Sequence, residues 1–145
     1  MKIPLIGYIF VFFLFSFLGW IFENILVKEP SYDNFSKHLG IQCMPMLWIY
    51  GLGAVLILAL YVYIPGPLIV KILLATIIVN IMECLCGQLS KIVYGRQTWS
   101  YASWRIPMCG GYISIITAIF WSILIAIAYI ILSKTINNRI KLYYS

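Results

Sequence analysis

The sequence predicts an all-α integral membrane protein built as a four-helix bundle. Of its 145 residues, 63% are hydrophobic and only 10% are charged, whereas a soluble domain is about half apolar and about a quarter charged. Three long stretches carry no charged residue, at 3–22, 39–70 and 106–133. A helix of ~20 apolar residues crosses a bilayer. Helices are expected rather than open strands because a spanning segment must satisfy its own backbone hydrogen bonds.

The charge-free stretches supply the first, second and fourth helices. The third helix follows the tight turn Pro65-Gly66-Pro67, whose prolines end one helix and begin the next. The predicted helices cover residues 4–27, 45–64, 68–90 and 107–132. A basic tail, 133–145, is suited to the lipid headgroup surface or to a frayed end. The whole chain, 1–145, is expected to form a single transmembrane domain.

Cationic side chains do not determine the orientation of this bundle. The first and third helices end, and the second and fourth begin, on one side of the membrane, which we call the loop side. The side of the termini carries Lys2, Lys71, Lys134, Arg139 and Lys141, and the loop side carries Lys28, Lys37, Lys91, Arg96 and Arg105. The positive-inside rule compares Lys and Arg, so this tie leaves both a fixed orientation and dual insertion open. The net charge of +6 reflects these flanks rather than nucleic-acid binding.

Two acidic residues, Glu23 and Glu83, lie inside predicted spans, near their loop-side ends. A carboxylate in a hydrocarbon span is costly, so it usually faces the protein interior or a wet cavity. Each belongs to a stripe of polar and small residues at three- and four-residue spacing: Ser16-Gly19-Trp20-Glu23 and Asn80-Glu83-Cys84-Gly87. We expect the two stripes to face each other, either as a packing seam or as a polar pocket open to the loop side. Arg96 and Arg105 are the expected counter-charges.

The loop-side half of the bundle therefore holds the candidate site for a substrate or an ion. Its candidate residues are Glu23, Glu83, Trp20, Asn80, Tyr50, Trp99 and Tyr101. No metal site is expected, because His38 and Asp33 supply fewer ligands than a zinc site uses. A Gly-x-x-x-x-Gly-Lys-[Ser/Thr] phosphate loop does not occur, so any ATP-driven role requires a separate partner chain. We expect a protein that is not an enzyme and that has no catalytic residues and no cofactor.

The four cysteines suggest only one disulfide. Cys84 and Cys86 are two residues apart on a helix and point in different directions, so they cannot easily pair. Cys43 and Cys109 both lie at loop-side helix ends and could form a disulfide if that side is oxidising. Otherwise the cysteines are small hydrophobic residues. A thiol oxidoreductase is a weaker alternative, because no Cys-x-x-Cys pair is present.

Several of these segments resemble the motifs of a known family in order along the chain. The segments are 16–23 (Ser-Phe-Leu-Gly-Trp-Ile-Phe-Glu), 49–54 (Ile-Tyr-Gly-Leu-Gly-Ala), Met82-Glu83 with Gly87, 99–101 (Trp-Ser-Tyr) and Gly110. Together they are similar to the family named "Putative ABC-transporter type IV", the CmpB-like small integral membrane proteins. The resemblance covers about residues 8–125 and implies a multi-pass, permease-like protein in the plasma membrane if the source is bacterial.

The chain departs from the family pattern at several loop-side charges. His38 and Leu39 stand where the family has Asn-Arg, Lys91 replaces an acidic residue, Ser100 replaces Asp and Gly111 replaces Arg. Glu23 and Glu83 remain. Two functions are therefore expected as alternatives: a permease-like protein with a polar pocket around these acids, or a structural or accessory subunit of a larger membrane assembly. The expected partners are the lipid bilayer and either further copies of the chain or other membrane subunits, and not nucleic acid.

Overall fold

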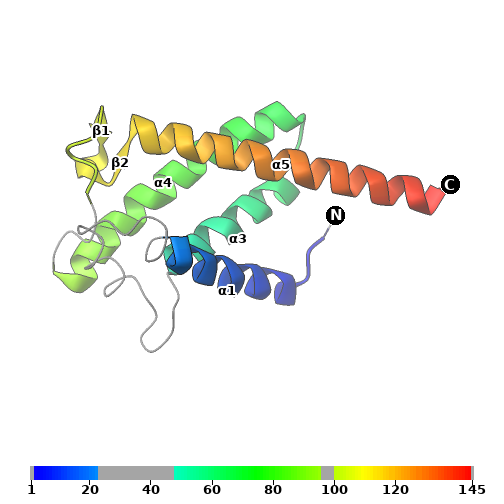
Figure 1. The fold of residues 1–145 in the computed structure, drawn as a ribbon, viewed down its shortest axis with the longest axis horizontal. Helices are drawn as coiled ribbons and strands as arrows, with labels where there is room; N and C mark the ends of the chain where they lie inside the picture. The colour runs from blue at the N-terminus through cyan, green and yellow to red at the C-terminus, as the bar shows by residue number, and fades with distance from the viewer. Residues whose placement is uncertain (1, 23–47, 96–99, 145) are drawn as a thin grey trace.

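The structure is a computed structural model that describes residues 2–22, 48–95 and 100–144 (Figure 1). Within these ranges the chain forms four α-helices and a very short β-hairpin. The helices are α1 (Leu5–Ile21), α3 (Trp48–Tyr63), α4 (Leu68–Tyr94) and α5 (Ile115–Tyr144). The strands β1 (Pro107–Met108) and β2 (Ile113–Ser114) pair antiparallel around the 3-10 turn η3 (Cys109–Gly111). The predicted all-α class is confirmed.

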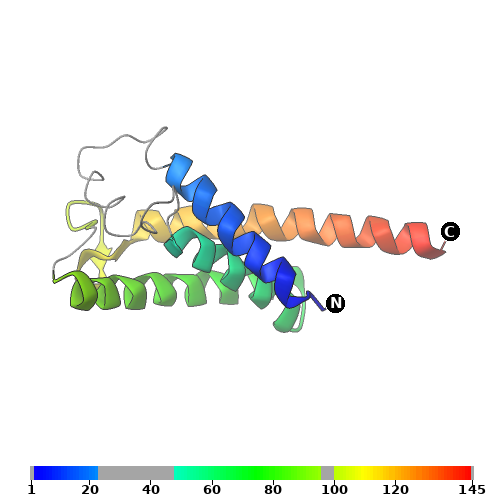
Figure 2. The same cartoon turned by 90° about the horizontal axis from the view of Figure 1, so that it is seen from below.

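The helices pack in the order of the chain, with α1 against α3, α3 against α4, and α4 against α5. Figure 2 shows α3 lying between α1 and α4. The termini and the turn between α3 and α4 lie at one end of the molecule, and the β1–β2 hairpin lies at the other (Figure 1). The hairpin end corresponds to the loop side of the sequence prediction.

The third predicted helix begins where the sequence placed it and ends later. α4 starts at Leu68, directly after Pro67, which lies in extended conformation at the N-cap. The helix runs to Tyr94 instead of ending at residue 90, and it stops at Gly95, which adopts a left-handed conformation with φ 73°. The Gly95 N–H donates to the carbonyl of Lys91 at 2.9 Å. A glycine in this conformation is a common helix terminator because it has no Cβ to clash.

The prediction that the last helix begins at Pro107 is wrong, since α5 begins at Ile115. The intervening residues form the hairpin and its turn, in which Cys109, Gly110 and Gly111 all have positive φ. An α-helix cannot continue through residues in this conformation. The paired glycines therefore reverse the chain before the membrane helix starts.

A capping interaction sets the observed start of α5. The backbone N–H of Thr117 donates to Ser114 Oγ at 3.2 Å, and the backbone N–H of Ser114 donates to Thr117 Oγ1 at 2.8 Å. Both contacts satisfy backbone donors at a helix N-terminus that would otherwise have no partner, in the manner of a capping box.

The ends of the other predicted helices also differ in part from the structure. α5 continues through residues predicted as a tail and ends at Tyr144 rather than at 132. No Gly or Pro interrupts residues 133–144, so nothing local ends the helix there. The predicted end of the first helix (23–27) and the predicted start of the second (45–47) lie outside the described residues.

The distribution of side chains is that of a membrane protein. α4 and α5 are long and apolar enough to cross a bilayer, while α1 and α3 are shorter apolar helices of 17 and 16 residues. Large apolar residues are exposed along α4, among them Leu73, Ile77, Ile81, Leu85 and Leu89. Several polar residues are instead buried: Ser16, Glu83, Ser90, Ser114 and Thr117. An exposed apolar surface of this extent requires lipid or another chain to cover it.

Two clusters of buried residues hold the helices together. The hairpin-end core consists of Ile49, Cys86 and Tyr112. The termini-end core consists of Ala75, Val79, Ile125 and Tyr129. Tyr129 also donates a hydrogen bond of 2.7 Å to the carbonyl of Ile57, which links α5 to α3.

Candidate functional site

A cavity of about 390 Å³ lies where the two cores meet. It is lined by α1, α3, α4 and α5 and by Tyr101, which precedes the hairpin. Aromatic and aliphatic side chains form most of its wall, and Glu83 is the only charged residue among the described residues that line it. In the described part of the chain the cavity is thus an apolar space with one carboxyl group.

Glu83 lies in this position because it belongs to the buried stripe of α4. Ala75, Val79, Glu83, Cys86 and Ser90 are all buried and follow one another at intervals of three or four residues, which places them on one face of a helix. Four of the five are small or aliphatic; Ala75 and Val79 pack against α5, and Cys86 packs against Ile49 and Tyr112. The carboxyl group takes the place that an apolar side chain would occupy in an ordinary helix contact.

The carboxyl group of Glu83 is held by a tryptophan from the facing helix. Only 7% of the Glu83 surface is exposed, and its Oε2 accepts a hydrogen bond of 2.8 Å from Trp121 Nε1. Thr117, Trp121, Ile125 and Tyr129 are spaced by four residues and share the face of α5 that packs on α4. A buried indole N–H usually finds an acceptor, and here the acceptor is the carboxylate itself.

Among the residues that the structure describes, no Lys or Arg forms an ion pair with Glu83. Of the two expected counter-charges, Arg105 is exposed near the hairpin and Arg96 lies outside the described residues. Lys91 is also exposed. Within the described part of the chain, an ionised Glu83 is therefore stabilised by one neutral hydrogen-bond donor, Trp121, and not by a positive charge.

The aromatic walls of the cavity come from three helices and from the segment before the hairpin. Phe15 of α1 and Phe120 of α5 line it while remaining 43% and 49% exposed, so the cavity reaches the outer surface of the helices. Tyr50 lines it from α3. Tyr101 is positioned by its backbone N–H, which donates to the carbonyl of Gly111 at 2.6 Å, and its ring packs edge-on against Trp104.

Three of the seven candidate residues line the cavity, and two others lie outside its lining. Glu83, Tyr50 and Tyr101 line the same cavity. Trp20 packs against the hairpin-end core. Asn80 does not line the cavity, and its Nδ2 donates to the carbonyl of Thr76 on its own helix at 2.8 Å. Glu23 and Trp99 lie outside the described residues.

The two polar stripes were predicted to face each other, but Ser16 and Gly19 of the first stripe do not face the second. Ser16 and Gly19 of α1 pack on α3 rather than on α4. A Cβ on Gly51 of α3 would collide with Ser16 and with the backbone of Phe12, and a Cβ on Gly19 would collide with the ring of Tyr50. The absent side chains thus let α1 and α3 approach closely, which is the usual role of small residues between membrane helices.

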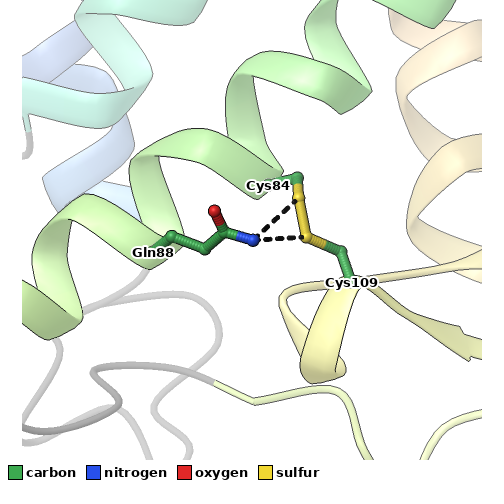
Figure 3. The surroundings of a disulfide bond; sticks show 3 residues. All are labelled: Cys84, Gln88 and Cys109. Carbon is green, nitrogen blue, oxygen red and sulfur yellow. Dashed lines mark hydrogen bonds between the residues drawn. A yellow bond between two sulfur atoms is a disulfide. The ribbon is translucent and has the colours of Figure 1, made fainter.

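A disulfide joins Cys84 of α4 to Cys109 of the hairpin turn, with the Cα atoms 6.0 Å apart (Figure 3). The expected partner of Cys109 was Cys43, and this pairing is therefore wrong; Cys43 lies outside the described residues. The side-chain amide of Gln88 approaches both sulfur atoms, at 3.8 Å from Cys84 and 3.6 Å from Cys109. Cys86 is a buried free thiol.

The disulfide follows from the way the hairpin folds back on α4. The ring of Tyr112 occupies the space where a Cβ of Gly87 would stand, so the hairpin approaches the helix backbone directly. Cys84 lies one turn before Gly87, within reach of the η3 turn. Sequence reasoning placed residues 107–114 in a helix and could not place Cys109 beside α4.

Several residues that line the cavity were missed in the sequence, and two of them are α5 residues with hydrogen-bonding side chains. Trp121 is the hydrogen-bond donor to Glu83, and Thr117 lines the cavity one turn earlier. The signal for Trp121 was present, because a tryptophan in the middle of an apolar helix needs an acceptor when it is buried. In the described part of the chain, no group of three His, Cys, Asp or Glu side chains is placed to hold a metal ion.

The comparisons with known proteins identify the family. The family model named "Putative ABC-transporter type IV" matches residues 10–145. A search of curated proteins and of solved structures gave no significant match. The family match covers nearly the whole chain, from within α1 to the end of α5, and the chain accordingly belongs to the Putative ABC-transporter type IV family of membrane proteins.

Proposed function

We propose that the protein is a multi-pass, permease-like membrane unit in which the cavity at Glu83 receives a solute or a cation during its passage. The observation that carries the proposal is the buried carboxyl group at the wall of a cavity of about 390 Å³. An ionisable residue within a membrane span is costly to bury, and its hydrogen bond to Trp121 adds no counter-charge. A ligand in the cavity would supply one.

The lengths of the helices support several crossings. α4 and α5 each exceed the ~20 residues of a spanning helix. α1 has 17 residues and rises about 26 Å, close to the ~30 Å thickness of the hydrocarbon core. α3 is nearly as long, at 16 residues, and packs between α1 and α4. A four-crossing arrangement places both termini on one side.

The small size of the bundle supports an oligomer or a partner subunit. The cavity reaches the outer surface at Phe15 and Phe120, so a second copy could close it. The sequence contains no phosphate-binding loop, so transport driven by ATP would depend on another chain. A non-enzymatic role agrees with membership of a family named for transport.

The experiment that tests this proposal compares the wild-type protein with Glu83→Gln in proteoliposomes. Movement of protons under an imposed membrane potential is followed with an internal pH dye, and movement of small cations with an internal dye selective for the cation. We expect flux in the wild type and its loss in Glu83→Gln, with unchanged helix content and a monodisperse profile. The matched control is Ser122→Ala, because the Ser122 hydroxyl donates to the carbonyl of Ile119 on its own helix and Ser122 is not among the described residues that line the cavity. Equal flux in the wild type and in Glu83→Gln would contradict the proposal.

A structural or accessory subunit is the second candidate function. It is favoured by the replacement of several charged family positions, among them Ser100 and Gly111, and by the exposed apolar surface of α4 and α5. We expect such a subunit to co-purify with other membrane chains in mild detergent. Light scattering that shows only copies of this chain, together with flux in their proteoliposomes, would exclude this role.

A further inference from the structure

We propose that the cavity binds a hydrophobic organic cation, with its charged nitrogen or phosphorus centre beside Glu83 and its hydrocarbon groups between the aromatic walls. The ligand class rests on the proposed function, because it names the occupant of the same cavity. Three features of the cavity support it: its size, its aromatic walls and the carboxyl group of Glu83.

The size of the cavity fits an organic ligand rather than a bare ion. Its volume of about 390 Å³ lies within the ~300–1,000 Å³ of small-molecule sites. A metal ion would need several oxygen ligands close together. Among the described lining residues, Thr117 supplies the hydroxyl on α5, and its Oγ1 is already bonded to the backbone N–H and carbonyl of Ser114. The described part of the wall therefore offers one carboxyl group and few further ligands for a metal.

The walls fit a cation with an apolar body. Tyr50, Tyr101 and Trp121 line the cavity together with Phe15 and Phe120. Aromatic faces attract a cation within about 6 Å, most strongly where water is excluded. The same rings bury hydrocarbon favourably. An inorganic cation would gain little from this surface, whereas an alkyl- or arylammonium ion would gain from both effects.

The charge of the site selects a cation over an anion or a neutral molecule. Within residues 2–22, 48–95 and 100–144, Glu83 is the only charged residue that lines the cavity, and no Lys or Arg described there pairs with it. A cationic ligand would neutralise the buried carboxylate. An anionic ligand of the same shape would meet an uncompensated like charge, which is strongly unfavourable in a site of low dielectric constant.

Tetraphenylphosphonium and tetraphenylborate give a direct test, because they have nearly the same shape and opposite charges. Binding of each to the full-length protein in nanodiscs is measured by isothermal titration calorimetry, with empty nanodiscs as the blank. We expect saturable binding of tetraphenylphosphonium and none of tetraphenylborate. Glu83→Gln should weaken the binding of tetraphenylphosphonium about 30-fold or more, as when one partner of a buried charge pair is removed. Ser122→Ala should leave the binding unchanged.

Binding of both ions with similar affinity, or of neither, by the wild-type protein would overturn the ligand class, and this comparison requires no variant to fold. Unchanged affinity in Glu83→Gln would also overturn it. The proposed function fails separately: binding of tetraphenylphosphonium without any flux would refute the permease role and keep the ligand class. Flux that depends on Glu83, without binding of tetraphenylphosphonium, would refute the ligand class alone.

The disulfide independently assigns a sidedness that Lys and Arg leave open. Disulfides form and persist in oxidising compartments and are rare in the cytosol. Cys84 and Cys109 are joined in the hairpin half of the molecule, and both termini lie at the opposite end. From this we infer that the hairpin end faces the outside of the cell and that the termini are cytoplasmic.

Two measurements in a bacterial host test this sidedness. A C-terminal green fluorescent protein fusion should fluoresce, and a C-terminal alkaline phosphatase fusion should be inactive, because the first matures in the cytoplasm and the second outside it. In the variant Cys43→Ser/Cys86→Ser, only Cys84 and Cys109 remain, and a maleimide-polyethylene glycol should label them after reduction alone. An active phosphatase fusion, or labelling of the denatured variant without reductant, would overturn the assignment.

Discussion

The hydrogen bond between Trp121 and Glu83 gives a quantitative test of the site. Trp121→Phe keeps an aromatic ring in the contact between α5 and α4 but removes the donor that reaches Glu83 Oε2 at 2.8 Å. A hydrogen bond to a charged group contributes about 1.5–3 kcal/mol, and one between neutral groups about 0.5–1.5 kcal/mol. Because Glu83 is only 7% exposed, water cannot readily replace the lost donor. We therefore expect Trp121→Phe to lower the free energy of unfolding by about 1.5–3 kcal/mol in the wild-type background.

The same substitution in a Glu83→Gln background should lower the free energy of unfolding by only about 0.5–1.5 kcal/mol, because the acceptor is then a neutral amide. The difference between the two backgrounds is the coupling energy of a double-mutant cycle. Unfolding is followed by circular dichroism during titration with sodium dodecyl sulfate in mixed micelles. Trp104→Phe is the control, since Trp104 is 39% exposed and does not line the cavity. A loss for Trp121→Phe no larger than for Trp104→Phe, or the same loss in both backgrounds, would refute the reasoning.

Three further predictions concern the packing, the cap and the disulfide, and the same unfolding assay checks each of them. Gly51→Ala should lower the free energy of unfolding by about 1–3 kcal/mol, because the new Cβ overpacks against α1. Gly53→Ala is the control and should have little effect, since its Cβ would meet the nearest side chains at 3.7 and 3.8 Å. Equal losses in the two variants would disprove the close contact between α1 and α3. Ser114→Ala should cost about 1 kcal/mol by removing the cap of α5, and a loss no greater than that of Ser122→Ala would count against the cap. Cys109→Ser should cost about 2–4 kcal/mol, and a stability unaffected by reduction of the wild type would show that the disulfide does not stabilise the fold.

The membrane class and the order of the helices could be predicted because they depend on composition and on local signals. Charge-free stretches of sufficient length predicted the helices, and Pro65-Gly66-Pro67 predicted the turn before α4, which starts at Leu68 as expected. Local signals were also misread. Ser114 and Thr117 form a recognisable capping pair, and Gly110 and Gly111 can adopt positive φ, but the proline at 107 was taken as the start of the helix.

The candidate site could be predicted only in part. Glu83 was singled out because a carboxyl group in an apolar span is unusual, and this reasoning needs no structure. Tyr50 and Tyr101 were included because they lie in the same half of the bundle, and the structure places both around the cavity. Asn80 shares the helix of Glu83, yet its amide is bonded to the carbonyl of Thr76. Spacing along one helix shows which residues share a face, but it does not show which neighbouring helix that face meets.

The sequence by itself determined that the chain is a helical membrane protein with a costly acid in its third helix, because the apolar composition and the position of one charge require no knowledge of distant contacts. The tertiary structure alone decided that Glu83 bonds to Trp121, that Cys109 pairs with Cys84, and that the small residues of α1 pack on α3. Each of these contacts joins residues 25 or more positions apart, so its partner depends on how whole helices pack. That packing is set by the summed shapes of their surfaces rather than by any short motif.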